Sequence, residues 1–169
     1  MTSLHIDPGG DGEPITIEGL SVLPEWIDYN GHMNVAYYLR AFDLAVDKIF
    51  ELIGLTERYR SESGYSCFAL ECHITYRKEL REGDPLRVSG QFLNFDGKRL
   101  HSIYRMYHAG EDYLASTAEW LQMSIDMHAC RSAPFQEPVA ERIAAILAQH
   151  SGLPRPPEVG RVMGVKRRA

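Results

Sequence analysis

The feature that most constrains the fold is a long apolar run with helical spacing at residues 34–53. Its apolar side chains recur every three or four residues, which is the period of an α-helix, and they form a wide stripe: Val35, Tyr38, Leu39, Phe42, Ala45, Val46, Ile49, Phe50 and Ile53. Gly54 follows directly and is a typical C-terminal stop. A stripe this wide predicts a helix that a sheet wraps around, because a helix lying on a surface buries a narrower face.

Strand-like segments lie on both sides of this helix. One short segment precedes it and four longer ones follow: residues 15–23, 65–78, 85–95, 99–108 and 113–127. Asp96-Gly97 is a strong hairpin signal, so the later strands form an antiparallel meander. We therefore expect an α+β fold, with a curved antiparallel sheet of about five or six strands around one central helix. Such a sheet has an open edge and an outer face, which both favour self-association.

The remaining segments are expected to be peripheral to one domain at residues 15–135. Residues 1–14, rich in Gly, Pro and acidic side chains, predict a flexible leader. We expect a polar connection at residues 56–63 and a C-terminal helix within residues 136–153. Residues 154–169 are Pro-rich and then basic, which predicts a tail or a clamp on a neighbouring subunit.

Charge and cysteine content argue against several classes of protein. A net charge of −5 argues against a nucleic-acid partner. Cys67, Cys72 and Cys130 do not make a disulfide framework, and they lack the second pair that a zinc site needs. We expect buried free thiols and no metal. With no signal-peptide pattern and no apolar run of about 18 residues, the sequence predicts a cytoplasmic protein that does not contact a membrane.

The residues most suited to chemistry form the heptad DYNGHMN, directly before the helix. It places the carboxylate of Asp28, the imidazole of His32 and the amide of Asn34 beside a helix N-terminus. That end of a helix offers unpaired N–H groups and a partial positive charge. Asp28 is equally suited to a turn or a cap, and Asn34 to a helix cap. Gly31 allows a tight backbone path in either interpretation.

This heptad, within DYNGHMNVAYYLRAFD, and the order of elements resemble the hotdog-fold acyl-CoA thioesterases. The 4-hydroxybenzoyl-CoA thioesterase group carries an acidic residue three positions before a loop glycine, a spacing that Asp28 and Gly31 meet. A narrower similarity, in VLPEWIDYNGHMN, DGKRLH and RSAPF, is to the betainyl-CoA thioesterases of carnitine breakdown. Those enzymes cleave a thioester that bears a quaternary ammonium group. The resemblance covers residues 15–135 and implies a hotdog fold and hydrolysis of an acyl-CoA.

The resemblance also implies roles for single residues. Asp28 activates water or attacks the carbonyl, and the backbone N–H of Val35 polarises the thioester oxygen. His32 and Asn34 orient Asp28 or the thioester, and Gly31 shapes the substrate loop. No cofactor is expected, because coenzyme A is part of the substrate. We expect the protein to act as a homodimer or homotetramer.

Substrate contacts are expected from strands and aromatic residues. Glu71 and His73 lie on the polar face of residues 65–78, where they contact either the substrate or a partner subunit. Arg77, Lys78 and Arg99 stand at strand ends, where they suit CoA phosphates or simply discourage edge aggregation. Five aromatic residues are candidates for a wall that binds a quaternary ammonium group, or are plain core: Trp26, Tyr29, Tyr38, Tyr76 and Trp120. Trp26 is the best candidate, since it lies two residues before Asp28.

Two other functions remain open from the sequence. The first is a hydratase or dehydratase on the same fold, whose Asp and His are separated by four residues. Asp28 and His32 have three residues between them, which counts against hydration. The second is a non-catalytic module that binds an acyl-CoA without turning it over.

Overall fold

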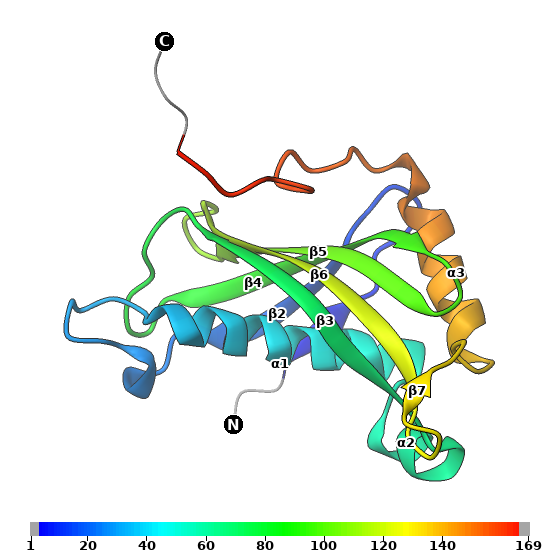
Figure 1. The fold of residues 1–169 in the computed structure, drawn as a ribbon. Coiled ribbons are helices and arrows are strands. Elements are labelled where there is room, and N and C mark those ends of the chain that lie inside the picture. The colour runs from blue at the N-terminus through cyan, green and yellow to red at the C-terminus, as the bar shows by residue number, and fades with distance from the viewer. Residues whose placement is uncertain (1–3, 166–169) are drawn as a thin grey trace.

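The computed structural model describes residues 4–165 as one curved antiparallel sheet folded around a long helix (Figure 1). Within these residues the sheet has seven strands in the order β1-β2-β4-β5-β6-β3, with β7 paired to β6. The strands are β1 (His5–Asp7), β2 (Ile15–Ser21), β3 (Tyr65–Tyr76), β4 (Pro85–Phe95), β5 (Arg99–His108), β6 (Leu114–Asp126) and β7 (Arg131–Ser132). The helices are α1 (Val35–Ile53), α2 (Glu57–Ser63) and α3 (Val139–Gln149), with short 3-10 turns at Pro24–Trp26 and His150–Gly152. The predicted α+β hotdog fold is confirmed, with its sheet curled around α1.

The helix α1 begins and ends where the sequence predicts. Its N-cap is Asn34, whose Oδ1 accepts a hydrogen bond of 3.0 Å from the N–H of Ala36. Gly54 ends it with a φ of 87°, a left-handed conformation that glycine adopts without a Cβ clash. Its buried face consists of Tyr38, Ala41, Phe42, Ala45, Val46, Ile49 and Ile53. Full burial of each large apolar side chain on this face stabilises the fold by about 1.5–3 kcal/mol.

The sheet and α1 meet closely at Gly90 on β4. An ideal Cβ at this position would lie 3.0 Å from Cδ1 of Ile49 and 3.0 Å from Cε1 of Tyr104. Both neighbours are fully buried, so neither side chain moves aside without disturbing the close-packed core. The missing side chain at Gly90 therefore lets the sheet lie against the helix.

Strand β3 lies at an edge of the sheet and contains a β-bulge. Its register with β6 shifts between Ala69 and Glu71, so Leu70 is the extra residue and the inward–outward alternation changes there. After the bulge, the polar face predicted for Glu71 and His73 is the outer face of the sheet. Before the bulge, Phe68 pairs with Met123 and so lies on this outer face as well. A sequence pattern alone does not reveal a bulge, because it depends on the partner strand.

Two segments that the sequence predicts as irregular are ordered elements. Residues 5–7 of the expected flexible leader form β1, in which Ile6 pairs with Ile17 and packs against the core. The expected polar connection contains α2, whose first turn Thr56 caps by accepting the N–H of Tyr59 at 3.1 Å. Both elements are too short to show a periodic pattern, so the sequence does not predict them. Residues 1–3 of the leader lie outside the described part of the chain.

The C-terminal segment differs from the predicted tail. Residues 154–165 run across the outer face of the sheet, where Glu158 is only 8% exposed and pairs with Arg77 at 3.3 Å. The N–H of Gly160 donates to Oε2 of Glu119 on β6 at 2.8 Å. This segment is therefore held on the chain's own sheet up to Gly160. The basic residues 166–169 lie outside the described part.

The cysteines are free thiols, as expected. The prediction that they are buried is wrong for Cys72, on the edge strand, and for Cys130, in the turn before β7, since both are exposed. Burial raises the pKa of Cys67 to about 12. Across residues 4–165, no helix is long and apolar enough to cross a membrane.

Replacing Gly90 with Val is expected to lower the free energy of unfolding by about 1–3 kcal/mol, because its methyl groups would overlap Ile49 and Tyr104. Urea unfolding of the purified protein measures this. Ser89→Val is the matched control, since Ser89 is the neighbouring residue on the other face of β4. Equal unfolding free energies for the two variants would mean that the close contact at Gly90 does not constrain the fold.

Candidate active site

The DYNGHMN heptad forms a tight loop at the start of α1. Ile27 and Met33 form an antiparallel bridge across its base. The N–H of Asp28 donates to the C=O of His32 at 3.0 Å, and the N–H of Gly31 donates to the C=O of Asp28 at 3.0 Å. Gly31 has a φ of 75°, in the left-handed region that favours glycine. Gly31 therefore provides the tight backbone path that the sequence predicts.

Two further hydrogen bonds attach this loop to the body of the protein. The N–H of Met33 donates to the C=O of the fully buried Leu80 at 2.8 Å, and the N–H of Asn34 donates to the C=O of Trp26 at 2.9 Å. Trp26 is 5% exposed, and its ring stacks on Tyr37 at a centroid distance of 5.7 Å. Because both attachments reach buried residues, the loop holds a fixed position relative to the helix.

The carboxylate of Asp28 is half-buried and engaged at one oxygen. Its Oδ1 accepts the N–H of Asn30 at 2.8 Å, the arrangement of an Asx turn. Within residues 4–165, its Oδ2 has no hydrogen-bond or ion-pair partner. The turn therefore accounts for one oxygen and leaves the other free to accept a proton or to attack a carbonyl carbon.

The start of α1, seven residues after Asp28, offers an unpaired amide in the described part of the chain. Asn34 caps the helix through Ala36, and the N–H of Tyr37 donates to the C=O of Asn34 at 2.9 Å. In the described part of the chain, the N–H of Val35 has no acceptor. The first turn carries no acidic residue, so the partial positive charge of the helix end is not neutralised. This amide is suited to polarise a carbonyl oxygen.

Strand β3 ends beside the start of this helix. The hydroxyl of Tyr76 donates to the C=O of Val35 at 3.2 Å, and its ring meets Tyr38 edge-on at 5.2 Å. Tyr38 is 4% exposed, and burial raises its pKa to about 12, so its hydroxyl stays neutral. Of the predicted aromatic wall, the structure therefore leaves Tyr38 inside the core, with Trp26 and Trp120.

In the described part of the chain, the side chains of His32 and Asn34 make no hydrogen bond with Asp28. Asn34 uses its side-chain oxygen for the helix cap, which is the structural alternative that the sequence left open. His32 is half-buried, and within residues 4–165 its ring makes no hydrogen bond. A supporting role for either residue stays a prediction.

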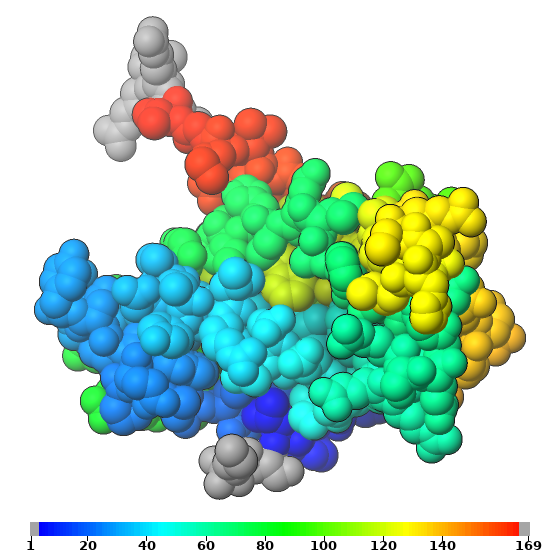
Figure 2. Space-filling view, turned by 60° about the horizontal axis from the view of Figure 1, so that its bottom comes forward, coloured from blue at the N-terminus to red at the C-terminus, as the bar shows by residue number. Residues whose placement is uncertain are grey.

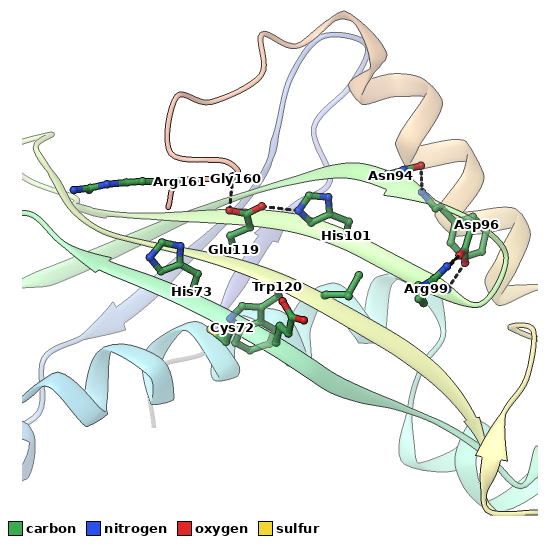
Figure 3. Close-up of a pocket in the computed structure, with 13 residues that line it drawn as sticks. Cys72, His73, Asn94, Asp96, Arg99, His101, Glu119, Trp120, Gly160 and Arg161 are labelled. Atoms are coloured by element: carbon green, nitrogen blue, oxygen red, sulfur yellow. Dashed lines mark hydrogen bonds and ion pairs between the residues drawn. The ribbon is translucent and has the colours of Figure 1, made fainter. Parts of the chain in front are cut away.

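Glu71 and His73 lie apart from this loop, on the outer face of the sheet. They line a pocket of about 740 Å³ between β3, β5, β6 and the C-terminal segment, and Asp28 and Val35 are not part of it (Figure 3). The alternation of β3 places their side chains opposite to Tyr76, whose hydroxyl reaches the helix. Within one chain, the structure does not bring them together with Asp28.

Two residues in this pocket escaped the sequence analysis. Nε2 of His101 lies 2.7 Å from Oε1 of Glu119, whose other oxygen accepts the N–H of Gly160 (Figure 3). Both oxygens of Glu119 are therefore occupied, and the pair ties the C-terminal segment to the sheet. In the sequence, His101 and Glu119 are recognisable only as polar residues within strand patterns. The register of β5 against β6 is needed to show that the two side chains meet. We therefore place the candidate chemistry at the Asp28 loop.

The three basic residues predicted to bind CoA do not form one cluster. Lys78 lies 3.5 Å above the ring of Tyr113, Arg77 pairs with Glu158, and Arg99 pairs with Asp96 at 2.7 Å. Arg99 aligns with Met123 of β6, whereas the end of β3 before Arg77 aligns with Ser116. Seven residues of strand separate these positions, roughly 23 Å. Arg77 and Lys78 therefore lie near the helix start, and Arg99 lies toward the other end of the sheet.

A strip of exposed apolar side chains runs along the edge strand β3 and the first turns of α1. In Figure 2 part of α1, in light blue and cyan, is visible between the preceding loop and β3. The exposed large apolar residues on these two elements are Val35, Leu39, Phe68, Leu70 and Tyr76, each at 42–60% exposure. Such a strip on an unpaired edge strand is typical of a surface that another chain covers.

Comparison with known proteins places this geometry in a family. The model of the thioesterase-like superfamily matches residues 22–143. The betainyl-CoA thioesterase of Pseudomonas aeruginosa is 41% identical over 144 residues, which cover 85% of this chain and 91% of that protein. An L-carnitine dehydrogenase/betainyl-CoA thioesterase of Rhizobium is 34% identical. The match covers 94% of this chain and spans 32% of the length of that relative.

Solved structures agree with the fold. A hypothetical protein of Staphylococcus aureus, determined in complex with CoA, has a TM-score of 0.84 and 30% identity, with 98% of both chains covered. A 1,4-dihydroxy-2-naphthoyl-CoA thioesterase from Synechocystis has a TM-score of 0.69 at 18% identity, covering 76% of this chain and 94% of that one. The second likeness supports the fold alone.

Proposed function

The chain belongs to the thioesterase-like superfamily and is an acyl-CoA thioesterase, and we propose that it hydrolyses betainyl-CoA, or another short-chain acyl-CoA, at the Asp28 loop. The observation that carries the assignment of the site is that one short loop contains both a carboxylate oxygen and a helix N–H that have no partner in the described part of the chain. The support for the acyl group is the 41% identity to a betainyl-CoA thioesterase over nine-tenths of that protein.

The proposed reaction begins with the thioester oxygen accepting a hydrogen bond from the N–H of Val35. Asp28 takes a proton from water as the water oxygen bonds to the carbonyl carbon, and negative charge develops on the thioester oxygen beside the helix end. When this intermediate collapses, the C–S bond breaks and the CoA sulfur takes the proton from Asp28. In the direct variant, a carboxylate oxygen of Asp28 bonds to the carbonyl carbon, the C–S bond breaks and CoA leaves as its thiolate. Water then hydrolyses the resulting anhydride, which releases the acid and restores Asp28.

No further component is included in this proposal. Attack of water on a thioester transfers a proton and an acyl group and moves no electrons to an acceptor, so the proposal contains no cofactor beyond the CoA of the substrate.

We also propose that the enzyme acts as a homodimer or homotetramer. Strand β3 is an edge strand with exposed apolar residues, and the start of α1 beside it is exposed as well. A second copy that covers this strip would close the candidate site from the open side. Three pockets in the described part of the chain do not include Asp28, as expected if residues from two chains together bind the acyl group.

The activity is tested by measuring release of CoA thiol from betainyl-CoA and from short, branched and aromatic acyl-CoAs, with Asp28→Asn alongside. We expect turnover of betainyl-CoA, and a loss of about 10²–10⁴-fold in kcat for Asp28→Asn, because an amide accepts no proton from water at neutral pH. Turnover of no ester would reject the thioesterase. Full activity of Asp28→Asn would reject the site. Hydration of crotonyl-CoA at a higher rate than any hydrolysis would favour the hydratase.

Replacing Val35 with Pro removes the candidate amide with little effect on the helix. Proline is favoured at the first helical position, and Asn34 already has the extended conformation that a residue before proline requires, with φ −64° and ψ 143°. We expect kcat to fall by about 10²–10³-fold with an unchanged unfolding temperature. Val35→Ala, which keeps the N–H, is the control and should retain activity. A fully active Val35→Pro enzyme would contradict the role of this amide.

Self-association is tested by sedimentation velocity. We expect a mass at least double the 19.2 kDa of one chain, and we expect Leu70→Glu on the edge strand to dissociate it. Val162→Glu is the control, because Val162 is exposed on the C-terminal segment and should tolerate a charge. A monomeric wild-type protein, or an unchanged assembly of Leu70→Glu, would count against the proposal.

A further inference from the structure

The structure separates the aromatic residues near the candidate site into two classes. Trp26, Tyr38 and Trp120 are 4–5% exposed, so the core covers their ring faces. Tyr29 is 97% exposed at the tip of the loop. Tyr76 is 50% exposed at the end of β3, directly beside the start of α1. Of these five rings, Tyr76 therefore combines an accessible surface with a fixed position at the helix end.

Two contacts fix the ring of Tyr76. Its hydroxyl donates to the C=O of Val35 at 3.2 Å, and its ring meets Tyr38 edge-on at 5.2 Å and 82°. Tyr38 is itself buried, so it provides a rigid support. The hydroxyl contact links the edge strand to the same residue whose N–H is the candidate oxyanion donor. The hydroxyl of Tyr76 therefore contacts the residue whose N–H would bind the thioester carbonyl, and the ring lies beside the helix start.

The chemistry of a betainyl group places its cation in the same region. One methylene joins the quaternary nitrogen to the thioester carbonyl, so a carbonyl held at Val35 keeps the trimethylammonium group close to the helix start. That end of α1 repels a cation, because it carries partial positive charge and its first turn has no acidic residue. A compensating attraction is therefore required, and the face of an aromatic ring within about 6 Å supplies one.

We propose that Tyr76 is a specificity-determining residue, whose ring attracts the cationic end of the acyl group while its hydroxyl positions the first turn of α1. This inference rests on the proposed thioesterase and names the residue that distinguishes a cationic from a neutral acyl group. The ring and the hydroxyl have separable functions, since the ring acts on the substrate and the hydroxyl acts on the helix. Burial raises the pKa of Tyr76, which keeps the hydroxyl protonated and able to donate.

The test compares betainyl-CoA with 3,3-dimethylbutanoyl-CoA, in which a carbon atom replaces the quaternary nitrogen and the shape is unchanged. We expect the wild-type enzyme to have a higher kcat/KM for the cationic ester. Tyr76→Leu should lower the ratio of the two kcat/KM values by roughly 2- to 30-fold, the factor that a cation–π contact supplies. The ratio is the informative quantity, because a general folding defect lowers both rates alike.

Tyr76→Phe separates the two functions of the side chain. It keeps the ring and removes the hydroxyl, so we expect the ratio for the two esters to stay near the wild-type value while kcat falls for both. Tyr29→Leu tests the exposed aromatic residue beside Asp28. Tyr107→Leu is the control on the opposite, outer face of the sheet, where the ring of Tyr107 on β5 lies 5.1 Å from the guanidinium carbon of Arg87. Neither of these leucine variants should change the ratio.

The outcomes distinguish this inference from the function on which it rests. If the wild-type enzyme hydrolyses neither ester, the proposed substrate fails and the inference fails with it. If it hydrolyses betainyl-CoA but shows the same ratio as Tyr76→Leu, only the role of Tyr76 is overturned. A change of the ratio in Tyr29→Leu and not in Tyr76→Leu would transfer the role to the loop and also overturn the inference.

Discussion

The burial of one face of α1 against the inner face of the sheet is the interaction on which the rest of the structure depends. Ile49 and Phe42 on the helix and Tyr104 and Phe92 on the sheet are all essentially inaccessible to water. Gly90 permits the contact by leaving no side chain between the two layers. The strand before the helix, β2, and the strand after it, β3, lie toward opposite edges of the sheet.

The same burial places the polar loop at the rim of the core, where the helix begins. There the stability of the helix and the proposed chemistry compete for the same groups. Asn34 uses its side chain to cap the N–H of Ala36, and Asp28 uses one oxygen for its turn. The N–H of Val35 and the second oxygen of Asp28 have no partner in the described part of the chain. A loop of this kind can be ordered by its own hydrogen bonds and still retain an acid–base group and an electrophilic amide.

The outer face and the open edge of the sheet have different roles. On the outer face, Glu119 satisfies both of its oxygens with His101 and the C-terminal segment, so the charged residues there mainly hold the chain together. At the edge, by contrast, Leu70 and Tyr76 remain exposed, and Tyr76 borders the helix start. A protein that leaves apolar residues exposed next to its candidate site is suited to complete that site with a second chain.

The sequence predicts the central helix with both its ends, the four long strands to within a residue or two, and the heptad that contains Asp28. These are local features: helical spacing, a capping Asn34, a terminal Gly54 and the hairpin turn at Asp96 and Gly97 each depend on neighbouring residues. Which side chains meet in space depends instead on how distant segments pack. The bulge at Leu70, the pairing of His101 with Glu119, the burial of Trp26 and the contact of Tyr76 with Val35 all join elements distant in sequence. Strand register and packing fix such contacts, and neither is encoded in the periodicity of a single segment.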